Sequence, residues 1–503
     1  MTDLPVDRRL GGGPRPGQAG EPDAPVRDAL RRAVATLAAH PRVAAAALGT
    51  WTLLLSALAL RSPAAVIGTL LALVLLVMVV RYPEAAVCAL LLLVPFHFAL
   101  YSVVTGRLHV HVGNATLWKD LLVGALLVRG LVRQIAARRS FSEMLAPGDR
   151  GLVAYGLFLA LLATVSPDLT TAGYALATVV EGPMLFLAIM LLRPGRRALR
   201  AALWSMLAAA GIMAVVALIE QAGPKAAFDP WFGGLAPLPN SSFFLNGGSI
   251  YRSGAFFASP LQLAFYGAAA AALATGVAIG TRGAARVLAT LVAILSTAAV
   301  VVSFTRSGYI GGGVGVMLVL LLGVRRVPLR LALMGTVATV AVAAVTFSVA
   351  SGDEHLSHSG EGSSHVDILR ADLNLFAFQP LGYGLGSVDA IAQRFDRNSG
   401  FATESTLLAT GMQGGIEELV AYLVVLFWTA MRVRTARRAA MAAGDWEAAG
   451  ICAGALGAQW AVFLAGLFLG VQALPVELVL WGAPAIALAF TGSRVSSKVS
   501  QPL

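Results

Sequence analysis

The amino-acid sequence predicts an all-α polytopic membrane protein, with about 12–14 transmembrane helices of about 20 residues each and one large extracytoplasmic loop. Hydrophobic residues make up 57% of the chain and charged residues only 13%, about half the charged share of a typical soluble domain. Long apolar runs recur along the chain, and the two-residue alternation of a membrane barrel is absent. Because each run must satisfy its own backbone hydrogen bonds inside a bilayer, helices are expected.

The first 42 residues are expected to form a disordered cytoplasmic tail with a short surface helix. Residues 1–26 are polar and rich in Gly, Pro and Arg, so they lack the apolar side chains for a core and do not resemble a cleavable signal peptide. Residues 27–40 fit an amphipathic helix lying on the membrane.

About fourteen spans are expected after this tail, judged by runs long enough to cross the hydrocarbon core. They divide the chain into N-terminal helices over 43–250, a core over 251–431, and C-terminal helices with a short cytoplasmic tail over 432–503. The spans lie near 43–60, 64–80, 84–104, 116–132, 151–165, 173–192, 198–219, 255–280, 284–304, 307–324, 328–350, 404–431, 449–470 and 474–491.

The distribution of Arg predicts the orientation of these spans. Most Arg lie in connections on the same side as the N-terminus, and the positive-inside rule assigns that side, with both termini, to the cytoplasm. Residues 105–115, 220–254 and 351–403 then face the extracytoplasmic side. The net charge of +11 reflects this topology, so no nucleic-acid partner is expected. The residues concerned are Arg133, Arg138, Arg139, Arg193, Arg196, Arg197, Arg200, Arg282, Arg286, Arg325, Arg326, Arg330, Arg432, Arg434, Arg437, Arg438, Arg494 and Lys498.

The interval Ser351–Ser405 is the longest polar stretch between apolar segments. A membrane protein with one large polar loop usually works there. The spacing of His355, His358 and His365 matches no zinc pattern that we would accept, so no metal is expected and a solvated, mobile loop is favoured. His365 stays open as a base or as a contact for the acceptor.

Three Arg on the outer side run against the positive-inside bias: Arg252, Arg306 and Arg370. Each could be a side chain that reaches from a helix end to the membrane surface. As a set they indicate an anion site, because a guanidinium binds phosphate with two parallel hydrogen bonds. A lipid-linked diphosphate is the anion most available at that depth.

Carboxylates and one Lys near the same face are further candidates. Glu404 lies where a span meets the outer surface, as a base or as a plain acid at a helix start. Lys119 and Asp120 are expected either to pair with neighbouring charges or to touch substrate. Glu181, about 12 Å into its span at 1.5 Å per residue, is a functional candidate or one half of a structural ion pair. The adjacent Glu417 and Glu418 lie deeper.

The order of four motifs resembles the O-antigen ligase and polymerase family of bacterial envelope glycosyltransferases, a branch of the membrane class C fold. The N-terminal part is similar only in character, including WKDLL at Trp118–Leu122. The four motifs occupy residues 250–420 in the family's order: RSGAFFASPLQLAFYG, SFTRSGYIGG, RADLNLFAFQPLGYGLG and ESTLLATGMQGGI.

The resemblance implies an inverting, metal-independent glycosyltransferase without a cofactor. It would move a glycan from a polyprenyl-diphosphate carrier to the hydroxyl of a glycan or lipid-glycan acceptor, on the outer face of a bacterial cell membrane and among its lipids. Arg252, Arg306 and Arg370 would hold the diphosphate. The family's base is a His followed by Asn, Ser or Gln; here Glu404, followed by Ser405, stands at that position.

A transporter or flippase of lipid-linked sugars is the alternative, because it also combines many spans with internal Arg. Such a protein would be expected to line a central cavity with charges from both halves of the chain. This sequence instead gathers its unusual charges at one face beside one long loop.

Overall fold

The computed structural model confirms the all-α, multi-pass membrane class. It describes residues 74–75, 77–102, 118–223, 242–245, 248–257, 259–323, 328–338, 342, 361–388, 403, 405–468 and 474–499. In this part of the chain, nine helices are long and apolar enough to cross a membrane: Pro83–Leu100, Pro147–Val165, Leu169–Leu192, Arg196–Ala222, Pro260–Gly280, Gly283–Val302, Arg306–Gly323, Trp446–Leu467 and Pro475–Gly492. The expected span near 43–60 lies outside the described residues; of the span near 64–80, only residues 74–75 and 77–80 are described, and these are helical.

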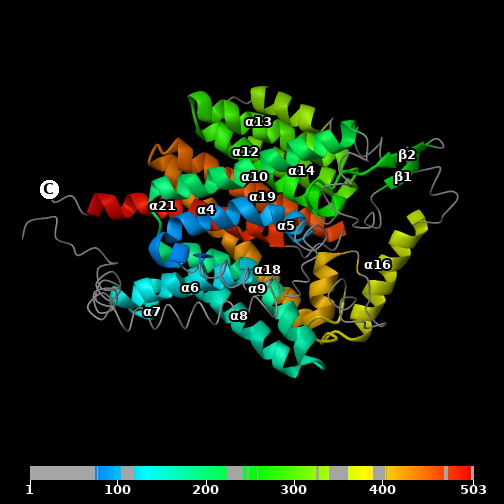
Figure 1. Cartoon of the computed structure of the whole chain (residues 1–503), viewed down its shortest axis with the longest axis horizontal. Coiled ribbons are helices and arrows are strands. Elements are labelled where there is room, and N and C mark those ends of the chain that lie inside the picture. The colour runs from blue at the N-terminus through cyan, green and yellow to red at the C-terminus, as the bar shows by residue number, and fades with distance from the viewer. Residues whose placement is uncertain are drawn as a thin grey trace, which may run out of the picture.

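The helices run in alternating directions and form one packed bundle (Figure 1). The first half of the described chain contains α4 (Pro83–Leu93), the 3-10 turn η1 (Val94–Phe96), α5 (His97–Ser102), α6 (Trp118–Ala136), α7 (Phe141–Met144), α8 (Pro147–Val165), α9 (Leu169–Leu192) and α10 (Arg196–Ala222).

The second half contains a short β-hairpin and the remaining helices. Its elements are β1 (Ser242–Leu245), β2 (Gly248–Tyr251), α12 (Pro260–Gly280), α13 (Gly283–Val302), α14 (Arg306–Gly323), α16 (Glu361–Phe378), α18 (Thr406–Ala442), α19 (Trp446–Phe468), α20 (Leu474–Glu477), the π-helical turn η5 (Leu478–Gly482) and α21 (Ala483–Val499). The strands pair antiparallel, with Ser242 opposite Tyr251.

Three features differ from the expectation. Within the loop expected over 351–403, residues Glu361–Phe378 form a helix, α16. The hairpin adds strands to a chain expected to be all helical. The span expected over 404–431 continues as α18 to Ala442 and contains a kink at Gly414 and Gly415.

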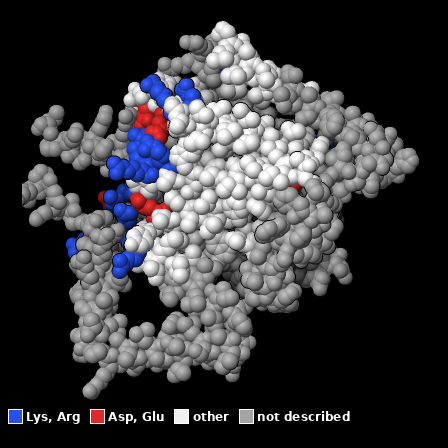
Figure 2. Space-filling model, turned by 45° about the horizontal axis from the view of Figure 1, so that its top comes forward, with Lys and Arg blue, Asp and Glu red and all other residues white. Residues whose placement is uncertain are grey.

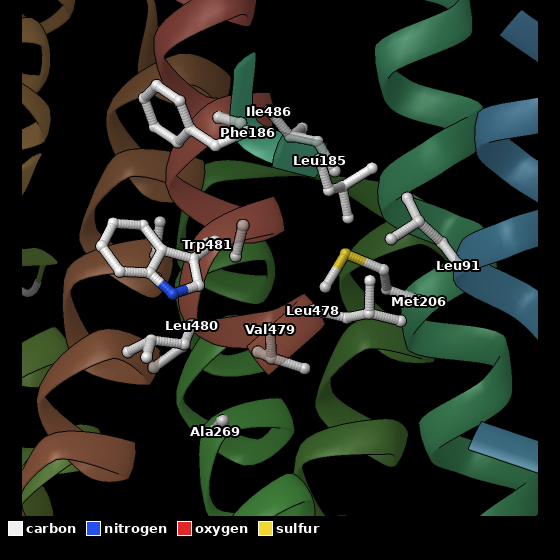
Figure 3. Packing of buried hydrophobic residues seen from close by; sticks show 14 of the residues in the cluster. Leu91, Leu185, Phe186, Met206, Ala269, Leu478, Val479, Leu480, Trp481 and Ile486 are labelled. Atoms are coloured by element: carbon white, nitrogen blue, oxygen red, sulfur yellow. The ribbon is translucent and has the colours of Figure 1, made fainter. Parts of the chain in front are cut away.

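The last span occupies the middle of the bundle. All five residues of η5 are buried, and Trp481 lies among Phe186, Leu185 and Ile486 (Figure 3). A π-helical turn widens the helix by one residue, which here directs Leu478 to Trp481 into the surrounding helices. The central position of this turn makes the last span a core element.

A seam of small residues joins α12 to α19, and another joins α14 to α19. A Cβ on Gly276 would lie 2.4 Å from Cα of Gly454, and one on Gly315 would lie 2.6 Å from the carbonyl oxygen of Gly457. Real Cβ atoms do not approach so closely, so the backbones touch directly. Small residues allow this close packing, on which membrane helices rely in place of a hydrophobic driving force.

Lys and Arg gather at one end of the bundle, which we call the basic end (Figure 2). There Arg196 lies 2.7 Å from Asp445, Arg200 lies 2.7 Å from Glu447, and Arg432 lies 2.5 Å from Asp149. These pairs join connections that are far apart in the sequence. They bring the helix ends predicted to be cytoplasmic together on one side.

Several Arg at the basic end also cap helices. Arg133 donates to the carbonyl oxygen of Leu192 at 2.8 Å, near the end of α9. Arg437 donates to the carbonyl oxygen of Leu322, near the end of α14. The last carbonyls of a helix lack partners and carry its negative dipole end. The Arg that set topology therefore also stabilise helix ends.

Orientation can be tested with reporters. Because helix ends with many Arg stay in the cytoplasm, a reporter inserted after Gly444, between α18 and α19, is expected to be cytoplasmic. A reporter inserted after Gly360, before α16, is expected to be extracytoplasmic. Paired phosphatase and fluorescent fusions measure this, and reversed signals at both positions would contradict the orientation.

Candidate functional site

The candidate site lies at the end of the bundle opposite to the basic end, which we call the loop end. Arg437 contacts Leu322 in the last turn of α14 at the basic end, so the first residue of α14, Arg306, lies about 24 Å away along the helix. The loop before α12 and the residues that follow α16 up to Val388 lie at the same end (Figure 1).

Arg252 and Arg306 lie together there. Arg252 donates from Nε to the carbonyl oxygen of Ser303 at 3.1 Å and from Nη2 to Oγ1 of Thr305 at 3.0 Å. These bonds hold Arg252 against the turn from which Arg306 starts α14. Burial lowers the pKa of Arg252, and the positive charge of Arg306 lowers it further.

This arrangement can hold an anion. Two guanidinium groups near each other repel, and an anion between them would remove the repulsion. Arg306 is exposed at the first turn of α14, where the positive end of the helix dipole also favours negative charge. The structure thus brings together two of the three Arg expected to bind a diphosphate.

A carboxylate not singled out in the sequence holds the Arg252 segment. Glu220, in the last turn of α10, accepts hydrogen bonds from the Ser253 hydroxyl and, at 2.8 Å, from the amide of Ala255. The amide of Ser253 donates to the carbonyl oxygen of Val302 at 3.2 Å. An acid in the last turn of an apolar span was the available signal, because such a buried group needs a specific partner.

The glycine motif after α16 has a structural role in α18. We call Pro380–Gly386 the Gly loop. At the kink of α18, Gly414 and Gly415 leave helical geometry, so the backbone groups nearby lose their helical partners. The Gly loop replaces those partners: Tyr383 N to Met412 O at 2.7 Å, Gly384 N to Gln413 O at 2.9 Å, and Ile416 N to Pro380 O at 2.8 Å.

Only glycine fits the turning points of the Gly loop. Gly382, Gly384 and Gly386 have φ of +85°, +97° and +78°, a left-handed region that costs other residues about 1–2 kcal/mol. A Cβ on Gly382 would also lie 2.5 Å from the amide nitrogen of Gly415. The motif therefore fixes the first half of α18 to the segment that follows α16.

The two candidate bases are placed less directly. Glu404 lies outside the described residues, and so does the side chain of His365, whose backbone belongs to α16. Next to Glu404, the buried Ser405 caps α18: its Oγ accepts from Leu408 N at 3.5 Å and donates to the carbonyl oxygen of Gly466 at 3.4 Å.

Arg370 is not brought to the Arg252–Arg306 pair by any contact in the described residues. It lies on α16 with 74% of its side chain exposed, and its Nη1 is 3.8 Å from Asp367 on the same helix. An exposed pair of this kind contributes little stability. A role for Arg370 in binding a diphosphate remains a prediction.

Lys119 forms ion pairs with both Asp120 and Glu181. Nζ of Lys119 lies 2.9 Å from Asp120 and 2.8 Å from Glu181, whose side chain is 2% exposed. Beside them, Nε1 of Trp118 donates to Nδ1 of His97 at 3.0 Å. Of the two alternatives for these residues, the structure shows the ion pair, which joins α6 to α9.

Neither a metal-ligand cluster nor a known relative identifies the site. In the part of the chain that the structure describes, no three His, Cys, Asp or Glu side chains come close enough to hold a metal ion. No protein-family model matches the chain, and a search of curated proteins finds no relative. The expectations drawn from the family resemblance therefore remain proposals.

The glycine at position 382 is expected to be essential for stability. Gly382→Ala adds left-handed strain and a clash with α18, a loss of at least about 1–3 kcal/mol. Gly173→Ala is the matched control, because a Cβ there meets nothing within 4 Å. Thermal unfolding in detergent measures the stability of both variants. Equal unfolding midpoints would contradict a stabilising role for the backbone contact between the Gly loop and α18.

The ion pair is expected to depend on both partners. Lys119→Met leaves Glu181 buried without its cation and is expected to cost about 3–5 kcal/mol, whereas adding Glu181→Met recovers most of the loss. Equilibrium unfolding of the single and double variants tests this. A double variant as unstable as the single one would show that the charges do not act as a pair.

Proposed function

We propose that the protein is a membrane glycosyltransferase that moves a glycan from a polyprenyl-diphosphate carrier to an acceptor hydroxyl on the extracytoplasmic face. One observation supports this most: Arg252 and Arg306 lie together at the loop end, against the start of α14. That end is opposite to the Arg-rich connections, so a purely topological role does not account for the two charges.

The chemistry suits two guanidinium groups. When the glycosidic bond to the carrier breaks, negative charge develops on the leaving diphosphate. Donors placed where that charge develops lower the barrier and need no reorganisation. The planar fork of Arg binds phosphate oxygens in pairs, which a Lys cannot do. The proposed mechanism therefore needs no divalent metal and no cofactor.

A base must take the proton of the acceptor hydroxyl. We assign this role to Glu404, because it immediately precedes the capped, buried start of α18. General base catalysis by a carboxylate contributes typically about 10²–10⁴-fold. His365 on α16 is the alternative base. A single displacement by the activated hydroxyl inverts the anomeric carbon.

The donor and acceptor meet at the membrane surface. The polyprenyl tail stays in the bilayer, so the donor enters sideways between helices at the loop end, in a bacterial cell membrane with both termini cytoplasmic. The acceptor is a glycan or lipid-linked glycan. α16 lies beside this end of the bundle (Figure 1).

A transporter or flippase of lipid-linked sugars is the second candidate. It is favoured by the charges that lie within the bundle, such as Glu181 and Glu418, both 2% exposed or less. However, Glu181 is already paired with Lys119. The two candidates differ in what purified protein does, since a flippase needs two compartments.

Turnover in detergent tests the proposed function. Purified protein mixed with a synthetic polyprenyl-diphosphate sugar and a glycan acceptor is expected to form an elongated glycan and free carrier, with EDTA present. Mass spectrometry measures both products. Absence of transfer, together with lipid movement in sealed vesicles, would support the transporter instead. Turnover that stops in EDTA and returns with Mg²⁺ or Mn²⁺ would contradict metal independence.

Arg306→Lys is expected to lower both donor binding and kcat. It keeps the charge and loses the paired hydrogen bonds, which strengthen as the diphosphate leaves. A loss of about 10-fold or more in kcat/KM corresponds to about 1.4 kcal/mol. Arg286→Lys at the basic end is the control and is expected to be near wild type. Equal kinetics for both variants would remove Arg306 from the donor site.

A further inference from the structure

The second half of α18 has one exposed side that changes from apolar to basic toward the end of the helix. The exposed positions follow one another in steps of three and four residues, which keeps them on one side of a helix. Four of them are apolar and between 41% and 58% exposed, and the last two are arginines. We call this side the open face of α18; its residues are Val420, Val424, Phe427, Met431, Arg434 and Arg438.

Two contacts of α18 show where the membrane surface lies along it. A Cβ on Gly148, in the first turn of α8, would lie 2.1 Å from Nε1 of Trp428, so this half-exposed indole lies against the start of a membrane-spanning helix. Arg437 donates to the carbonyl oxygen of Leu322 in the last turn of α14, which is also membrane-spanning. Tryptophan is enriched at the boundary between membrane and water. The helix therefore passes the membrane surface between Trp428 and Arg437.

The two arginines of the open face lie at the level of the lipid headgroups. Their Cα atoms are about 9 Å and 15 Å beyond that of Trp428 at 1.5 Å per residue. The Cα–Cβ bonds of a helix tilt toward its N-terminus, so the side chains of Arg434 and Arg438 lean back toward the membrane. Long arginine side chains can cover several ångströms in this way. The phosphates of phospholipids are the anions at this level.

The positive charges at the end of α18 are not neutralised within the part of the chain that the structure describes. There, neither Arg434 nor Arg438 has a hydrogen bond or an ion pair. Burial lowers the pKa of Arg437, and the charges of Arg438 and Arg434 lower it further. Three carboxylates of the basic end are already used, Asp149 by Arg432, Asp445 by Arg196 and Glu447 by Arg200.

The apolar part of the open face has a firm aromatic border. The ring of Phe427 lies 5.6 Å from that of Trp460 and 5.7 Å from that of Phe463, both on α19, measured between centroids. The rings of α19 are only partly buried themselves. A hydrocarbon chain that lies along Val424 and Met431 would therefore meet side chains that their neighbours hold in place.

We propose that the open face of α18 binds one anionic phospholipid from the leaflet at the basic end. Arg434 and Arg438 hold its phosphate, and an acyl chain lies along Val424, Phe427 and Met431. The fork of a guanidinium group suits phosphate oxygens, and two charges without a carboxylate favour a headgroup with net negative charge. A purely topological role would be served by arginines on any side of the helix.

The lipid would stabilise the end of α18 by reducing the repulsion among its arginines. It would lie at the end of the bundle opposite to the candidate site for glycosyl transfer. The inference is therefore independent of the proposed enzymatic function, and its test needs no sugar donor.

Lipid titration of the purified full chain in detergent tests the proposal, with thermal unfolding as the measurement. A ligand that binds only the folded state raises Tm with its concentration. Phosphatidylglycerol is expected to raise Tm in a saturable way by about 2 °C or more, whereas phosphatidylcholine and inorganic phosphate at the same concentrations are expected to leave Tm unchanged. An equal shift with phosphatidylcholine would overturn the preference for an anionic headgroup. An equal shift with inorganic phosphate would overturn a lipid as the occupant.

Variants locate the effect. Arg434→Gln combined with Arg438→Gln is expected to weaken the affinity for phosphatidylglycerol about 25-fold, because each arginine near an anionic lipid contributes about fivefold. Arg138→Gln combined with Arg282→Gln removes the same charge from the basic end outside the open face and is expected to keep the wild-type affinity. Equal losses in the two double variants would show an effect of net charge and overturn the site.

Native mass spectrometry gives a second readout that does not depend on stability. One phosphatidylglycerol is expected to stay bound to the wild type and to the control variant, and to be lost from the variant without Arg434 and Arg438. The same retention by all three proteins would overturn the assignment. If that double variant does not fold, each single variant is compared with the wild type, with an expected loss of about fivefold in affinity; unchanged affinity in both would likewise overturn the assignment.

Discussion

The hydrogen bonds between the Gly loop and the kink of α18 are the constraint on which the loop end depends. A kink leaves backbone amides and carbonyls without partners, and in a membrane protein no free water is at hand to replace them. The carbonyls of Met412 and Gln413 are satisfied by a second stretch of chain. That chain can approach because Gly382 and Gly415 carry no side chain at the contact. The outer segment and the bundle are thereby joined through backbone.

This junction links the two sides of the candidate site. Behind it, Leu385 donates from its amide to Oγ of Ser166 at 3.0 Å, so the corner between α8 and α9 is fixed to the same loop. Across the loop end, Glu220 and the turn before α14 hold Arg252. Backbone contacts and hydrogen bonds, and not packing alone, thus position Glu220 and Arg252.

Much of the fold could be predicted from sequence, because each apolar run by itself indicates a span and the Arg next to a span indicate which of its ends lie on the same side. α12 begins at Pro260 rather than at 255, and the basic ends meet as the Arg pattern indicated. The grouping of Arg252 with Arg306 follows from topology, since both lie next to span ends that the alternation of the helices brings to the loop end. The role of the Gly loop could not be predicted. A Gly pair shows where a helix can break, but it does not show which segment will form hydrogen bonds with the backbone groups freed at the break. Glu220 was missed for the same reason: its partners are distant in the sequence.

The glycine seams of α12, α14 and α19 have a mechanical consequence. Where backbones touch, as at Gly276 and Gly454, helices cannot slide without colliding, so these three form a rigid platform. Arg306 stands on that platform. Any widening of the bundle at the loop end must therefore come from the other side, where α18 changes direction at Gly414. The side of the bundle that bears Arg306 is thus its rigid part, and the start of α18 is the part that can shift.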